Sequence, residues 1–204
     1  MVLLTYRYAS IISSQSRQTS GKPGPVRKLL SLFTRGPDRS RHGAWIYNAL
    51  VEQARRPQFY ESMEVPDTLD GRFDLIVLHA GLYLPRLKSV RADGKALAQA
   101  TFDQMFANME QGLRELGNGD MSVPKKIQKM VQAFYGRATA YDTALRGGDL
   151  AALRAALHRN VYRGAEISNT QLDALVTYVR AASQALQAAA DGDIVAGTFA
   201  WPAP

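Results

Sequence analysis

The stretch "FDQMFANMEQGLRELGNGDMSVPKKIQKMVQAFYGRATAY", residues 102–141, joins two helical patterns through a short polar linker. Before the linker, large apolar residues recur every three or four positions until Gly117, a residue type that commonly ends helices. After it, Ser122 is a candidate N-cap, and Pro124 falls near the first helical position, where its missing N–H costs nothing. The stretch therefore predicts a helical hairpin. The apolar sets, which we expect to be buried, are Ala98, Phe102, Met105, Phe106, Met109, Leu113 and Leu116, then Ile127, Met130, Val131, Phe134, Ala138, Tyr141 and Leu145.

The linker is more elaborate than a hairpin requires, since a glycine stop and a cap would suffice. Lys125 and Lys129 are one helical turn apart and Lys126 lies beside them, so the three ammonium groups are expected to form one basic patch. Such a patch is either a docking surface or an ordinary solvated helix face.

Helical spacing extends outward on both sides of the hairpin. "FDLIVLHAGLYLPRL", residues 73–87, repeats its apolar residues at three and four rather than two, which favours a helix over a strand. Asp67 or Asp70 is its candidate N-cap, and Pro85 is expected to kink it. Further helices are predicted over about 39–55, ending before Pro57, over 150–160, capped by Asp149 after Gly147 and Gly148, and over about 169–190.

No segment after residue 60 alternates like a strand, so the predicted fold is all-α, a single-domain helical bundle of about six to seven helices. We expect an irregular basic N-terminal arm and an irregular C-terminal tail, with Phe199 or Trp201 anchoring the tail. The expected parts are a flexible extension (1–22), a basic amphipathic arm (23–38), a helical domain (39–190) and the tail (191–204). The extension contains no acidic residue, as expected of a transit peptide or of a misplaced start codon.

The amino-acid composition excludes some classes of function and suggests others. The chain has no cysteine, which excludes disulfides and thiolate chemistry, and no apolar run of the roughly 18 to 20 residues that a spanning helix needs. Residues 1–56 hold ten Lys/Arg against Asp38 and Glu52, whereas the rest is nearly neutral. A basic arm on a neutral body suggests contact with phosphates, either of RNA or of anionic lipids, or simply a solvated arm.

No catalytic motif is present. We find no phosphate-binding glycine loop, no metalloprotease motif and no nucleophile elbow. The three histidines, His42, His79 and His158, fall on separate predicted helices without metal-ligand spacing, and a hydrogen-bonded core histidine is the favoured interpretation of His79. The sequence therefore nominates no catalytic residue, no metal and no cofactor. A helical enzyme with a site at the bundle centre stays open only because bundles often host cofactors there.

Three strings carry a resemblance to a known family: "VPDTLDGRFD", "FDLIVLHAGLYLPRLK" and the quoted hairpin, with its "LREL-G-x-GD-x-x-VPK-x-x-K" and "FYGR-x-x-AY" motifs. Over roughly residues 40–190 the chain resembles the ubiquinol-cytochrome c chaperones, the assembly factors of the cytochrome bc1 complex, and its alanine-rich composition favours an alphaproteobacterial member. The resemblance implies a non-enzymatic chaperone that binds newly synthesised cytochrome b. The first 22 residues lie outside the family pattern.

The resemblance also implies partners, a cellular location and partner-binding residues for this chain. The implied partners are nascent or apo-cytochrome b, a small partner assembly factor and the ribosome, with no DNA, and the basic arm adds an expected peripheral contact with an anionic membrane surface. The implied location is the bacterial cytoplasm, peripheral to the inner membrane, or alternatively the matrix side of the mitochondrial inner membrane. An RNA- or ribosome-binding helical module that uses the arm and the lysine patch is the alternative function. The candidate partner-binding residues are Arg114, Asp120, Lys125, Lys126, Lys129, Arg137, His79 and Arg86.

Overall fold

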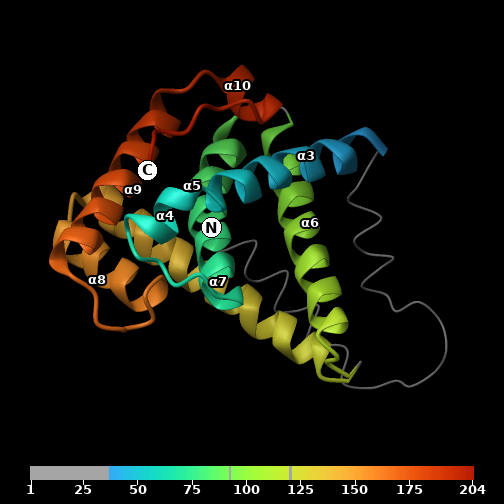
Figure 1. The fold of residues 1–204 in the computed structure, drawn as a ribbon. Helices are drawn as coiled ribbons and strands as arrows, with labels where there is room; N and C mark the ends of the chain where they lie inside the picture. Colours follow the sequence, from blue (N-terminus) through green and yellow to red (C-terminus); the bar gives the residue numbers. More distant parts are fainter. Residues whose placement is uncertain (1–36, 92, 120) are drawn as a thin grey trace. The chain divides into compact units, whose positions relative to one another are not determined.

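The computed structural model describes residues 37–91, 93–119 and 121–204. Within these ranges the chain forms eight helices and no strand, which confirms the predicted all-α fold (Figure 1). The extension 1–22, nearly all of the predicted arm and Asp120 lie outside the described residues. The helices are α3 (Pro37–Ala54), α4 (Pro57–Glu61), α5 (Leu69–Ser89), α6 (Gly94–Glu115), α7 (Val123–Gly147), α8 (Leu150–Asn160), α9 (Asn169–Ala188) and α10 (Asp191–Ala196).

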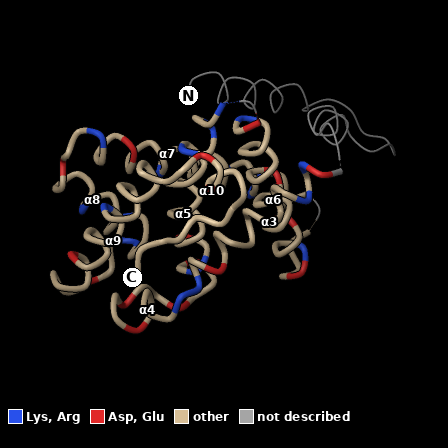
Figure 2. Tube along the Cα trace, turned by 90° about the horizontal axis from the view of Figure 1, so that it is seen from above, with Lys and Arg blue, Asp and Glu red and all other residues tan. Residues whose placement is uncertain are grey.

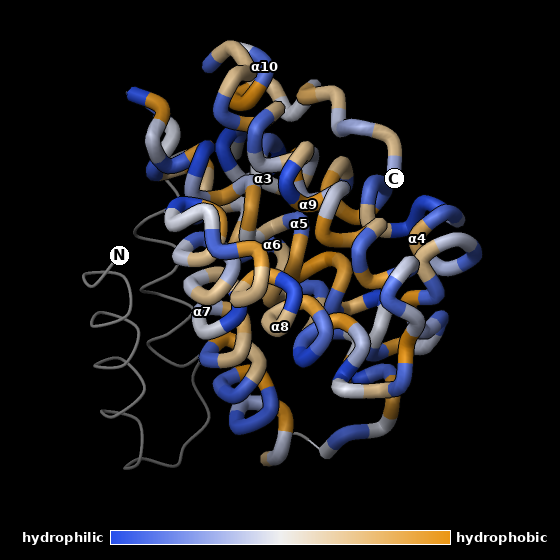
Figure 3. Tube along the Cα trace, turned by 90° about the vertical axis from the view of Figure 1, so that its left-hand side faces the viewer, coloured by the Kyte–Doolittle hydropathy of each residue, from blue (hydrophilic) through white to orange (hydrophobic). Residues whose placement is uncertain are grey.

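Helix α5 is the centre of the body. It packs against α6, α7, α9 and α10, and in the view from above the other long helices surround it (Figure 2). Every residue from Val77 to Leu84 is buried, on all sides of the helix, so the helical interpretation of this apolar run is confirmed and the strand alternative is wrong. Pro85 is exposed between the buried Leu84 and Leu87, and the helix continues through it to Ser89. Hydrophobic positions gather around α5 and its neighbours (Figure 3), although none of the described helices is long and apolar enough to cross a bilayer.

The N-cap of α5 differs from the prediction. Thr68, not Asp67 or Asp70, holds the extended capping conformation, and its Oγ1 accepts a hydrogen bond from the Gly71 N–H at 3.1 Å. Asp67 instead accepts two hydrogen bonds from the Arg72 guanidinium, at 2.6 and 3.1 Å. The carboxylates on either side of Thr68 thus leave the cap position to its hydroxyl.

The other predicted helix ends and starts lie at the glycine, serine and aspartate residues that were expected to mark them. Gly117 adopts a φ of 76° just after α6, a conformation that glycine reaches without a steric cost. Gly148 ends α7 in the same left-handed region, and the Asp149 carboxylate then caps α8 by accepting from the Ala152 N–H at 2.9 Å. Ser122 precedes α7 as predicted, but its hydroxyl donates to the Gly119 carbonyl at 2.8 Å instead of capping the helix.

Two short helices were not predicted. Pro57 ends the helical run before it and also begins α4, whose Phe59 is fully buried. In the tail, predicted to be irregular from residue 191, the first six residues form α10, with two acidic residues in its first turn and Gly197 as its left-handed stop. Beyond Gly197 the chain is irregular, as expected.

Phe199 and Trp201 anchor the tail, as predicted. The Trp201 ring lies edge-on to His79 with a centroid distance of 5.0 Å and contacts Tyr83 at 6.0 Å, while Phe199 packs against Trp201 at 5.1 Å. The hydroxyl of Tyr83 also donates to the Ile194 carbonyl at 2.6 Å. The C-terminal residues therefore cover the α5 core.

Substituting Gly43 by alanine is expected to destabilise the body. A Cβ at Gly43 would lie 2.7 Å from the backbone carbon of Ala100, so α3 and α6 would have to separate, at a cost of about 1 to 3 kcal/mol. Gly136→Ala on α7 is the matched control, because a Cβ there meets nothing within 4 Å. Its helix propensity should raise the stability by about 0.5 to 1 kcal/mol. Urea unfolding followed by circular dichroism measures both, and shifts of the same sign would contradict the close α3–α6 contact.

Candidate functional site

The connection between α6 and α7 is a hydrogen-bonded structure in its own right. The Asn118 side chain donates to the Leu113 carbonyl at 2.7 Å, and its backbone N–H donates to the same oxygen at 3.2 Å. The Ser122 N–H and hydroxyl both bond the Gly119 carbonyl, and Val123, which begins α7, is fully buried. These bonds fix the backbone on both sides of residue 120. In Figure 1 this connection lies at the opposite end of the body from α10.

The predicted basic patch forms at this connection. Lys125, Lys126 and Lys129 are exposed on the first two turns of α7, and the Lys126 ammonium donates to the Asn118 side-chain oxygen. Arg114, on the last turn of α6, is paired with Glu110 at 2.9 Å. The structure thus brings four of the predicted site residues to one end of the hairpin.

Two large apolar side chains lie exposed beside these cations. Leu116 is 62% exposed and Met121 is 91% exposed, although neither residue was predicted to be part of the site. The prediction that Leu116 is buried with the α6 stripe is wrong, because α6 ends at Glu115 and Leu116 turns away at the helix end. We call Leu116, Met121, Lys125, Lys126 and Lys129 the hairpin tip.

The other three predicted site residues lie inside the body and join its elements. The guanidinium of Arg86 donates to the carbonyls of Leu186 and Ala189, at 3.0 and 2.8 Å, and pairs with Asp191 at 2.7 Å. Arg86 therefore holds the end of α9 and the start of α10 against α5. The contacts of Arg86 support a structural role.

His79 has no exposed surface, so its contacts support the core interpretation and not a partner-binding one. Its Nδ1 lies 2.8 Å from the Leu75 carbonyl, which can only accept, so Nδ1 carries the proton and Nε2 accepts from the Tyr178 hydroxyl at 2.8 Å. Tyr178 in turn accepts from the Gln53 amide at 3.0 Å. Burial lowers the pKa of His79 to about 4, which keeps the ring neutral.

Arg137 binds a buried carboxylate. Its guanidinium donates to Oδ1 of Asp74, whose side chain is fully buried, and lies 5.9 Å from the centre of the Phe73 ring. Arg163 donates to the other carboxylate oxygen of Asp74 at 2.8 Å and reaches Asp70 at 2.9 Å. Burial raises the pKa of Asp74, and the two guanidinium groups oppose that rise. The cluster joins α5, α7 and the α8–α9 connection.

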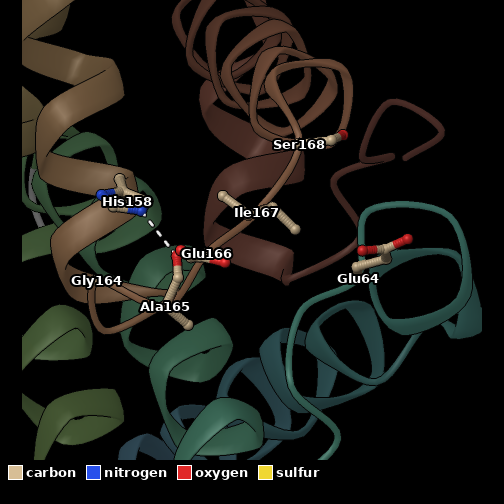
Figure 4. A pocket seen from close by; sticks show the side chains of 7 residues that line it. All are labelled: Glu64, His158, Gly164, Ala165, Glu166, Ile167 and Ser168. Carbon is tan, nitrogen blue, oxygen red and sulfur yellow. Dashed lines mark hydrogen bonds between the residues drawn. The ribbon is translucent and has the colours of Figure 1, made fainter.

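An open pocket of about 580 Å³ lies next to that connection (Figure 4). His158 Nε2 bonds the Ala165 carbonyl at 2.9 Å, and Glu64 accepts from Gln171 at 2.9 Å. The pocket is lined by Glu64, His158, Gly164, Ala165, Glu166, Ile167 and Ser168, and its side chains include no nucleophile paired with a base. Among the described residues no group of three or more histidines and carboxylates could hold a metal ion.

Comparison with known proteins gives one family throughout. A sequence model described as ubiquinol-cytochrome C chaperone matches residues 61–201. The chain is 28% identical over 158 residues to "Ubiquinol-cytochrome-c reductase complex assembly factor 1" of Xenopus laevis, covering 76% of this chain and 78% of that protein. The protein of that name from Mus musculus is 28% identical over 191 residues, covering 88% of this chain and 63% of the mouse protein.

A solved structure has the same fold. The crystal structure of the Cbp3 homolog from Brucella abortus superimposes with a TM-score of 0.73 at 36% sequence identity, and the match covers 86% of this chain and 97% of that one.

Proposed function

Because this chain belongs to the ubiquinol-cytochrome C chaperone family, whose model matches residues 61–201, we propose that it is a non-enzymatic chaperone that binds newly synthesised cytochrome b during assembly of the bc1 complex. The names of the vertebrate relatives, assembly factors of the ubiquinol-cytochrome c reductase complex, support this function. The match over 141 of the 204 residues is the observation that carries it. The comparisons offer no support for the alternative of an RNA-binding module.

In this proposal the hairpin tip, together with Arg114, is the surface by which the chain docks at the site of assembly. It gathers three exposed lysines and two exposed apolar side chains on a backbone fixed by its own hydrogen bonds. The chain would act at the inner-membrane surface, where its client is inserted. The likeness to the Brucella abortus protein supports a bacterial, cytoplasmic setting for that surface.

Loss of the gene should lower the amount of assembled bc1 complex, and the wild-type chain should restore it. Lys125→Glu/Lys129→Glu should restore less than half as much, because two cations of the docking surface become anions. Arg91→Glu/Lys95→Glu, the same charge change on exposed residues near the start of α6, should restore it fully. The readouts are haem b absorbance and native-gel levels of the complex. Normal bc1 levels without the gene would refute the proposed function.

A further inference from the structure

The hairpin tip exposes apolar side chains to water, where they contribute no burial to the stability of the fold. Five large hydrophobic residues are exposed among the described residues, and two of them, Leu116 and Met121, lie five positions apart at this one connection. The others, Trp45, Leu69 and Leu150, lie on three different helices. Clustered exposure of this kind marks a binding surface more often than single exposed residues do.

The backbone near these two residues has open space beside it. Among the described residues, no atom lies within 4 Å of a Cβ added at Gly112, Gly117 or Gly119. At these three positions, therefore, no described part of the body forms a groove against the backbone. A protein segment binds most tightly where a pocket encloses it, whereas a bilayer needs no pocket.

Positive charge adjoins the apolar pair. α7 carries Lys125, Lys126 and Lys129 and has no acidic residue between Val123 and Tyr141. The acidic side chains Glu110 and Glu115 belong to α6, where Glu110 pairs with Arg114 and Glu115 accepts from Gln111 at 2.8 Å. Asp120 is the one acid within the connection by sequence. Cations therefore face outward on the α7 side of the apolar pair.

We infer that the hairpin tip binds the surface of an anionic lipid bilayer. Leu116 and Met121 enter the boundary between headgroups and acyl chains, and the lysines contact lipid phosphates. An anionic bilayer has negatively charged headgroups at its surface and apolar acyl chains beneath them, and it deforms around an inserted side chain. It can therefore bind the lysines and the apolar pair of the tip at the same time. This inference deepens the proposed function, on which its biological setting rests, because it names the ligand of the same surface.

A labelled cysteine at the tip tests the insertion directly. The chain has no cysteine of its own, so Met121→Cys in the full-length protein takes a single environment-sensitive fluorophore. We expect its emission to rise and shift to the blue on adding vesicles of one part phosphatidylglycerol to two parts phosphatidylcholine, and much less with phosphatidylcholine alone. The same label at Leu69→Cys, on an exposed leucine of α5, should not respond. No response at position 121 would overturn the inference.

Vesicle sedimentation near physiological salt measures the affinity. Leu116→Ser/Met121→Ser should weaken binding at least about tenfold, because the apolar contribution of two large side chains is lost. Leu69→Ser/Leu150→Ser, which changes two exposed leucines elsewhere, should have no effect. The basic arm is present in every variant, so the comparisons are made at constant charge of the arm.

The charge test uses the same pair of variants as the complementation. Lys125→Glu/Lys129→Glu should weaken binding at least about twentyfold, since each lysine near an anionic surface contributes about fivefold and the two new carboxylates are repelled by the lipid phosphates. Arg91→Glu/Lys95→Glu lies roughly 30 Å away along α6, several Debye lengths from the tip, and should change binding less than about twofold. Equal losses in the two variants would mean that net charge alone drives binding, which would overturn the assignment to the tip.

Failure of this inference is distinguishable from failure of the proposed function. Tip variants that bind vesicles like the wild type but fail to restore the bc1 complex would show that the tip serves a protein partner, and the lipid assignment would fall. Tip variants that lose lipid binding and still restore the complex would uphold the lipid assignment while removing the tip from the chaperone's docking surface.

Discussion

Replacing Asp74 by alanine is expected to lower the free energy of unfolding by about 3 kcal/mol. The Asp74 carboxylate is fully buried and accepts hydrogen bonds from Arg137 on α7 and from Arg163 on the α8–α9 connection. Without it two guanidinium groups would face each other, and that of Arg137 is only 18% exposed. The half-exposed Arg163 can turn to solvent, which keeps the loss near the low end of the range for broken buried pairs.

Two further substitutions divide the cluster. Arg163→Ala should cost only about 1 kcal/mol, since Asp74 keeps its bond from Arg137 and the lost bond is half exposed. Asp67→Ala is the control, because the Asp67–Arg72 pair is exposed on both sides and its loss should change stability little. Urea unfolding of all three, followed by circular dichroism, ranks them. An Asp74→Ala protein as stable as Asp67→Ala would mean that the buried cluster contributes no net stability.

The long helices were predictable because their apolar spacing is a local property. Each spans at least three turns, so the period of 3.6 residues is visible against the alternatives. α4 and α10 have five and six residues, fewer than two turns, and no period can be recognised at that length. α4 contributes the buried Phe59, a tertiary contact that local spacing does not encode.

The candidate site was predictable only in part. The lysines lie within five positions of one helix, so their common face follows from helical geometry. Asp74 meets Arg137 and Arg163 across 63 and 89 residues, and no local pattern joins them. Leu116 fits the α6 stripe by spacing, and its exposure follows from where the helix ends. At the end of a helical hairpin, apolar spacing no longer implies burial, because a residue there can lie beyond the elements that pack along the helix.

His79 is expected to make stability depend on pH. Its pKa is about 4 in the folded state against 6.5 in the unfolded chain, because burial excludes the charged ring. Between these values the unfolded chain binds a proton that the native state does not, so stability falls as the pH decreases from about 6.5 to 4. A shift of this size corresponds to about 3 kcal/mol.

A second buried group acts in the opposite direction. Burial raises the pKa of Asp103 to about 6, which the hydrogen bond from Gln99 opposes only in part. Between about pH 6 and 4 the native state then binds a proton that the unfolded chain does not bind. The contribution of this carboxyl to the stability of the protein therefore increases as the pH falls. In the wild-type protein the two effects largely cancel, and a flat pH profile would not test either one.

Removing the Asp103 carboxyl therefore makes the effect of His79 on the pH dependence of stability measurable. Between pH 6.5 and 4, Asp103→Asn should lose about 3 kcal/mol more stability than Asp103→Asn/His79→Gln, because glutamine does not titrate there. Urea unfolding at half-unit pH steps measures the slopes of both variants. If the first and second variants have equal slopes, the neutral His79 held between Leu75 and Tyr178 is not the group that titrates on unfolding.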